Sequence, residues 1–185
     1  MSELIISSQD IRYLLTLQAS QENKILGKQA AIRHFLWIMS EYAGRERAII
    51  GATLSSNNQI SNTKLSILSS YSGRVLNGWD IVQKMISNSD IKMTSALANI
   101  KDIMFTKFEQ KRSALYNEGL NNMPYSLTTS EWINESTKAI NTILKAQKTS
   151  VKQTKETINI LKKDTYNSIM SVSYTHLTLP TTPYV

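Results

Sequence analysis

The chain has no cysteine and few residues that break a helix: three prolines and six glycines among 185 residues. Without cysteine, neither a disulfide framework nor thiol catalysis is available to it. The scarcity of proline and glycine, together with abundant Leu, Ile, Ala, Lys and Gln, favours long helices. No run of about 18 apolar residues is present either, so the sequence predicts no membrane-spanning helix in this chain.

Histidine is also scarce, and this limits the available chemistry. His34 and His176 are the two histidines. His34 lies near Phe35 and Trp37 in the sequence, and we expect it to be a helix-surface or partly packed residue rather than a catalytic one. No cluster of His, Asp and Glu has the spacing of metal ligands, no Ser-His-Asp set can be assembled, and no glycine-rich phosphate loop occurs. We therefore predict that the chain is not an enzyme, and we expect no cofactor and no metal site.

The C-terminal residues differ from the rest of the chain. Residues 172–185 contain two of the three prolines and no Lys, Arg, Asp or Glu. Their first ten residues, VSYTHLTLPT, resemble the translation of a transposase adaptor used in sequencing libraries. The resemblance implies that residues 171–185 are a non-native, disordered tail and that residues 1–170 are a helical domain truncated at its C-terminal end. We expect the natural protein to continue beyond Met170.

The chain is basic, with a formal net charge of +7 that comes wholly from residues before this tail. The densest stretch is residues 138–163, where seven lysines accompany one glutamate. These lysines are interleaved with Thr and Gln rather than with aromatic residues, which is typical of a solvated helix face. We therefore expect no nucleic acid among the partners.

Apolar residues recur at helical spacing in four stretches, which predict helices over residues 9–54, 62–87, 91–117 and from 129 or 130 onward. In the first stretch we allow for a break near Gly27. Short connections force successive helices to run antiparallel. We therefore predict an all-α fold, an up-down-up-down four-helix bundle whose first and last helices are the longest.

Two charged residues fall on apolar helix faces. Glu46 lies four residues after Tyr42 and four before Ile50, and Arg112 lies four residues after Phe108. A buried carboxylate without a partner costs several kcal/mol. Because Glu46 and Arg112 also fall at similar heights in the predicted bundle, we expect them to meet as a buried ion pair.

The arginines also allow a functional interpretation. Arg45 and Arg47 flank Glu46, and the planar fork of a guanidinium suits small anions. If Arg45, Arg47 or Arg112 has donors to spare, these residues form a candidate binding site for a small anion. The sequence leaves both interpretations open, the ion pair that sets packing register and the ligand site.

A resemblance to a known family rests on four short segments in a given order: SEYAGRERA at residues 40–48, GWD at 78–80, PYSL at 124–127 and EW at 131–132. Together they resemble the extracytoplasmic helical sensor region of bacterial methyl-accepting chemotaxis proteins, of the nitrate- and nitrite-sensing type. The resemblance covers about residues 25–144, and its first segment is the most specific.

The resemblance implies a ligand-sensing module of a bacterial transmembrane chemoreceptor. Such modules lie between two transmembrane helices, and the second of these leads to a HAMP linker and a cytoplasmic signalling coiled coil. This sequence departs from that plan, since it contains neither the membrane helices nor the signalling parts. It further implies a small-molecule or anion ligand, a homodimer, and a full-length protein anchored in the inner membrane with its sensor region in the periplasm. The signal is then expected to pass as a helix movement.

Two alternatives remain at this point. The same sensor module occurs on other outputs, so a histidine kinase or a diguanylate cyclase is an alternative to a chemoreceptor. The chain could also be a structural or interaction bundle that binds no ligand. Two hydrophobic spans flanking this region in the intact gene, with a HAMP-like segment after the second, would favour the receptor.

Overall fold

The computed structural model describes residues 2–87 and 89–177, which form helices joined by short connections and contain no strand. The chain forms two compact units, Met1–Val151 and Lys152–Val185. The all-α prediction is therefore confirmed for the described residues. None of their helices offers the long apolar stretch that crossing a bilayer requires.

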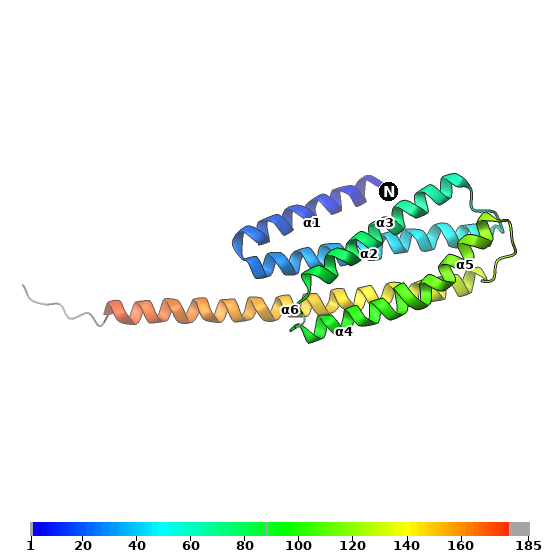
Figure 1. The fold of residues 1–185 in the computed structure, drawn as a ribbon. Coiled ribbons are helices and arrows are strands. Elements are labelled where there is room, and N and C mark those ends of the chain that lie inside the picture. The colour runs from blue at the N-terminus through cyan, green and yellow to red at the C-terminus, as the bar shows by residue number, and fades with distance from the viewer. Residues whose placement is uncertain (1, 88, 178–185) are drawn as a thin grey trace, which may run out of the picture. The chain divides into compact units, whose positions relative to one another are not determined.

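The helices follow one another along the chain with short connections (Figure 1). Their bounds are α1 Ser2–Glu22, α2 Lys24–Ser55, α3 Asn62–Met85, α4 Ile91–Ile100, the π-helix η1 Lys101–Phe108, α5 Glu109–Leu120 and α6 Thr129–Leu177. The α4, η1 and α5 segments are continuous and make up the predicted third helix. Figure 1 shows the chain reversing its direction at each of the other connections within the first unit.

The prediction of one long helix over residues 9–54 is wrong. The helix is interrupted at Asn23, and α1 packs back along α2 (Figure 1). Asn23 has extended backbone angles, and its side chain accepts hydrogen bonds from the backbone N–H groups of Ile25 and Leu26 at 2.9 and 3.2 Å. Asparagine is a favoured N-cap because it satisfies first-turn donors in this way. The helix α2 therefore begins at Lys24 and has 32 residues.

Gly27, where a break was allowed for, is instead a packing residue. A Cβ atom at this position would lie 2.5 Å from the Ser20 Cα atom of α1. Only glycine permits such a close approach of two helix backbones. The glycine therefore brings α1 onto α2 four residues after the actual break.

Side-chain caps define the starts of the later helices. The Asp90 carboxylate accepts from the Met93 N–H at 3.0 Å at the start of α4. Thr128 and Glu131 form a reciprocal capping box, in which the Glu131 carboxylate accepts from the Thr128 N–H at 2.8 Å and Thr128 Oγ1 accepts from the Glu131 N–H at 3.3 Å. The predicted start of the last helix at residue 129 is thereby confirmed.

The π-helix η1 is a feature that apolar periodicity did not predict. Residues five positions apart interact along it: Thr106 Oγ1 donates to the backbone carbonyl of Lys101 at 3.1 Å, and Lys107 Nζ lies 2.6 Å from Asp102 Oδ2. Such a segment is rare in proteins and is often found beside functional sites. It ends at Phe108, one turn before Arg112.

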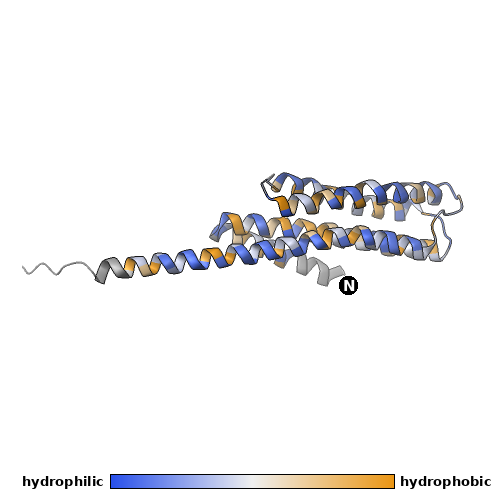
Figure 2. Ribbon diagram, turned by 90° about the horizontal axis from the view of Figure 1, so that it is seen from below, coloured by the Kyte–Doolittle hydropathy of each residue, from blue (hydrophilic) through white to orange (hydrophobic). Residues whose placement is uncertain are grey.

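The core of the first unit is formed by the apolar faces of α2 to α6. Figure 2 shows apolar and polar residues alternating along these helices, as expected for amphipathic helices. Side chains that are less than 2% exposed include Leu36, Met39, Ile50, Leu68, Val82, Met93, Ile100, Leu115, Trp132 and Ile143. On α3, Leu68, Val75 and Val82 are buried at helical spacing, which confirms the apolar face expected for residues 62–87.

The helix α6 continues through Leu177, so residues 171–177 of the predicted tail are helical. Residues 178–185, which include most of the predicted disordered tail, lie outside the described residues.

Candidate functional site

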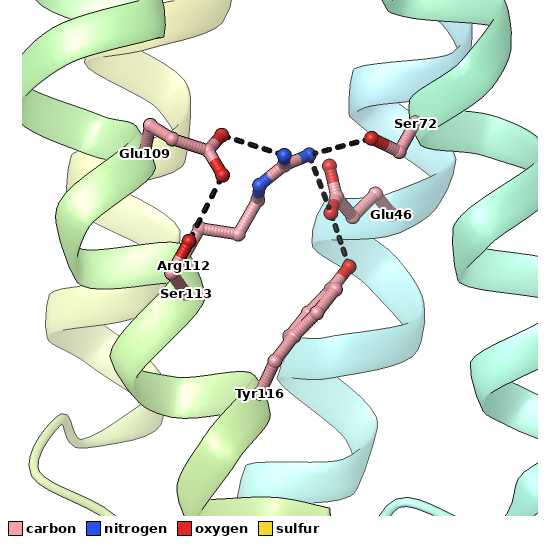
Figure 3. A network of polar contacts seen from close by, with 6 residues as sticks. All are labelled: Glu46, Ser72, Glu109, Arg112, Ser113 and Tyr116. Atoms are coloured by element: carbon pink, nitrogen blue, oxygen red, sulfur yellow. Dashed lines mark hydrogen bonds and ion pairs between the residues drawn. The ribbon is translucent and has the colours of Figure 1, made fainter.

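Glu46 is the most buried charged side chain among the described residues, with 2% of its surface exposed. It lies on α2 in the interior of the first unit (Figure 3). Its Oε1 atom accepts hydrogen bonds from the Tyr116 hydroxyl and from Arg112 Nη1, the latter at 3.3 Å. Both donors come from α5, so these contacts join α2 to α5.

Arg112 joins Glu46 to two further groups. Its Nη1 atom also donates to Ser72 Oγ of α3 at 3.3 Å, and its Nη2 atom lies 2.6 Å from Glu109 Oε2. Only 14% of the Arg112 side chain is exposed. We call Glu46, Ser72, Glu109, Arg112 and Tyr116 the polar centre, which ties together α2, α3 and α5 (Figure 3).

Burial determines the charge states in the polar centre. Burial raises the pKa of Glu46 above its ordinary value of 4.5, and Arg112 and the Tyr116 hydrogen bond offset only part of this effect. Burial, followed by the nearby Glu46 charge, also raises the pKa of Tyr116. Burial lowers the pKa of Arg112, but the Glu46 charge and the Glu109 hydrogen bond outweigh it, so the net shift is upward. Arginine and tyrosine therefore keep their protons, and Glu46 is the group that can change its charge.

A second arrangement lies on the outside of the same part of α2. A shallow, open depression of about 670 Å³ is bordered by α2, by Tyr71 of α3 and by Ile140 and Leu144 of α6. Arg45 and Arg47 both line it. We call this feature the arginine depression.

Arg45 is held in place by neighbours on α2 and α3. Its Nε atom donates to Glu41 Oε1 at 2.9 Å, and its guanidinium lies 5.1 Å from the centre of the Tyr42 ring. The hydrogen bond with Glu41 raises the pKa of Arg45, with burial acting in the opposite direction and Tyr71 adding a further hydrogen bond. Arg45 therefore remains a cation, and some of its N–H donors are used in hydrogen bonds with Glu41 and Tyr71.

Arg47 connects α2 to α6. Its Nη1 atom donates to Thr137 Oγ1 at 2.8 Å, and its backbone carbonyl accepts from Trp132 Nε1 at 3.0 Å. Trp132 is fully buried and its ring lies 5.2 Å from the Phe108 ring. This part of α2 is thus fixed by polar contacts on both sides.

The structure brings together Glu46 and Arg112, the two residues predicted to form an ion pair. It also places Arg45 and Arg47 in one depression. It does not bring Arg112 to that depression, because Arg112 faces the interior polar centre instead. The three arginines therefore do not form a single anion site.

Sequence reasoning missed Tyr116 and Glu109 as partners in the polar centre. Their spacing from Arg112, four residues after and three before, places them on the same face of a helix. That spacing is a usable signal, although it does not say which of the many residues so placed will meet a carboxylate.

Comparison with protein-family models, with curated proteins and with solved structures found no match for this chain.

Proposed function

We propose that this chain is the ligand-sensing module of a bacterial transmembrane chemoreceptor, with a small anion bound at Arg45 and Arg47. In this proposal α2, α3, the continuous segment α4 to α5 and the first part of α6 act as an up-down four-helix bundle. The resemblance of residues 40–48 to chemoreceptor sensor regions supports it, as does the helical fold. The membrane anchor, the periplasmic location, the homodimer and the signalling region belong to the same proposal.

The main support for the proposal is the arrangement of three consecutive residues of α2, whose side chains lie on two sides of the helix. Arg45 and Arg47 line the outer depression, and Glu46 between them contacts Arg112 and Tyr116 in the interior. A ligand that pulls on the two arginines therefore acts on the backbone that carries Glu46. Any resulting shift of α2 changes its polar contacts with α3 and α5.

A ligand can move such a bundle only if it binds two helix arrangements with different affinity. The polar centre supplies contacts that would differ between the arrangements, since hydrogen bonds of this kind depend strongly on distance and angle. Small sliding or rotation of one packed helix against its neighbours is a common form of such transitions. We therefore expect the signal to be a displacement of α2 relative to α5.

The absence of cysteine allows a direct test. Ala52→Cys on α2 and Gln110→Cys on α5 place two spin labels at exposed positions without any background thiol. The distance distribution between the labels would be measured with sodium nitrate, nitrite, acetate and hexanoate at equal ionic strength. We expect at least one anion to shift the distribution, and Arg45→Gln to abolish the shift.

Two outcomes would overturn the proposal. The first is an unchanged distance distribution with all four anions in a chain that is still helical by circular dichroism. The second is an equal shift in the Arg45→Gln variant, which would place the effect elsewhere. Either result would favour a structural helical bundle that binds no ligand at this depression.

A further inference from the structure

We infer that the arginine depression binds a monocarboxylate that carries an aliphatic or aromatic body, rather than a bare inorganic anion. This inference rests on the proposed function, since it names the ligand class for the same site. It comes from the composition of the depression and from one glycine in its lining.

The walls of the depression are largely apolar. Ile140 and Leu144 of α6 lie on one side, Tyr71 of α3 contributes an aromatic ring, and Ala48 and Ile49 of α2 complete the apolar lining. A nitrate or sulfate ion would contact the arginines and leave these groups exposed to water. An organic acid would cover them, and the burial of apolar surface adds affinity roughly in proportion to its area.

The charges in the depression suit a single negative charge. Glu41, Arg45 and Arg47 are its ionisable residues apart from Tyr71, so the sum of one negative and two positive charges is +1. Glu41 takes the Nε donor of Arg45, and Thr137 takes one donor of Arg47. Each guanidinium has five N–H donors, so donors remain for a carboxylate.

Gly44 keeps the depression open. It lines the depression in the middle of α2, and a Cβ atom built on it would meet nothing within 4 Å. Glycine inside a helix costs roughly 0.5–1 kcal/mol relative to alanine. No described atom packs on this position, so the glycine leaves room for a ligand to rest against the helix backbone.

The first experiment measures binding to the 185-residue chain by titration calorimetry at constant ionic strength. Its probes are hexanoate, acetate, nitrate and the neutral analogue hexanamide. We expect hexanoate to bind about tenfold more tightly than acetate or nitrate, because its methylene groups cover the apolar walls. Hexanamide should bind more weakly than hexanoate because it lacks the charge.

Arginine variants test whether hexanoate binds at the arginine depression. Arg45→Gln and Arg47→Gln should each weaken hexanoate binding about tenfold, the loss expected for a charged hydrogen bond. Arg74→Gln is the matched control, because Arg74 lies over the Tyr42 ring and does not line the depression. It should change hexanoate binding less than twofold.

Glycine variants test the open space without removing charge. Gly44→Leu should abolish hexanoate binding by filling the depression. Gly73→Leu is its control, because Gly73 is also helical, also has nothing within 4 Å of a built Cβ, and does not line the depression. Both variants should fold, since neither leucine meets an existing side chain or backbone atom at its Cβ.

The outcomes separate this inference from the proposed function. If nitrate binds as tightly as hexanoate and shifts the spin-label distances, the carboxylate assignment is wrong and the sensing proposal stands. If none of the anions binds, both are wrong. If Gly44→Leu changes the sedimentation mass of the chain, this face packs against a second copy, and the small-ligand assignment is wrong.

Discussion

The Glu46 carboxylate and the Arg112 guanidinium lie 3.3 Å apart although 66 positions separate them in the chain. Neither side chain has much access to water, so each depends on the other and on Tyr116, Ser72 and Glu109 for its polar contacts. A buried pair of this kind is costly to disrupt, because removing one partner leaves the other charge without compensation. Its contribution can be measured in several ways.

Replacing Glu46 by alanine should destabilise the fold strongly. Arg112 and Tyr116 would lose their acceptor inside the protein, and breaking a buried pair from one side costs about 3–5 kcal/mol. Urea unfolding followed by circular dichroism measures the change. Glu135→Ala is the surface control, since Glu135 forms more exposed ion pairs with Lys111 and Lys138 that are worth less than about 1 kcal/mol. Equal costs for the two variants would contradict the role of the polar centre.

The stability of the protein should depend on pH through Glu46. Because burial raises the folded-state pKa of Glu46 above 4.5, the folded state binds more protons than the unfolded state between these two values. The contribution of Glu46 is therefore fully present below about pH 4.5 and is lost as the pH rises through the folded-state pKa.

Comparison with Glu46→Gln isolates this effect, because glutamine cannot titrate and the other carboxylates stay the same. The free energy of unfolding of the wild type, minus that of Glu46→Gln, should fall as the pH rises from 4.5 toward neutral. Chemical unfolding at several pH values provides the data. A difference that stays nearly constant over this range and falls only as the pH drops below about 4.5 would show that Arg112 and Tyr116 outweigh burial and that the pKa of Glu46 is lowered.

Two glycines of α3 should respond to alanine in opposite directions. At Gly78 a Cβ atom would lie 2.8 Å from Met39 Cγ and 3.3 Å from the Phe35 carbonyl oxygen of α2, so Gly78→Ala should destabilise the fold by about 1–3 kcal/mol. At Gly73 nothing lies within 4 Å, so Gly73→Ala should stabilise it by about 0.5–1 kcal/mol. Thermal unfolding of both variants checks the pair, and destabilisation by Gly73→Ala would count against the described packing of α3.

The cap at Asn23 should contribute measurably to the start of α2. Asn23→Ala removes the acceptor for the Ile25 and Leu26 N–H groups and should cost about 1 kcal/mol. Hydrogen exchange of these two amides should accelerate, while amides in the middle of α2 should show only the global loss of stability. Asn23→Ser is the matched control, because serine caps about as well as asparagine; an equal loss in both variants would show that capping is not the role of Asn23.

Local spacing was enough to predict several particulars of this protein. The apolar positions of α3 at intervals of three or four residues predicted a buried helix face, and the start of α6 was predicted at residue 129 or 130, where the structure places it at Thr129. The same reasoning placed Glu46 and Arg112 on inward faces, because residues three and four apart share one side of a helix. The break at Asn23 carried a local signal too, since Asn is a favoured N-cap, but the apolar stripe continues across it and outweighed the cap.

The amino-acid sequence by itself determined that these residues form amphipathic helices and which side of each helix is apolar, because both follow from the spacing of neighbours along the chain. Tertiary structure alone decided that α1 folds back on α2, that η1 is a π-helix, and that Arg112 points to Glu46 while Arg45 and Arg47 line a separate depression. These features depend on the rotation and height of each helix against the others. Packing of the whole unit sets that rotation and height, and no local pattern of residues contains them.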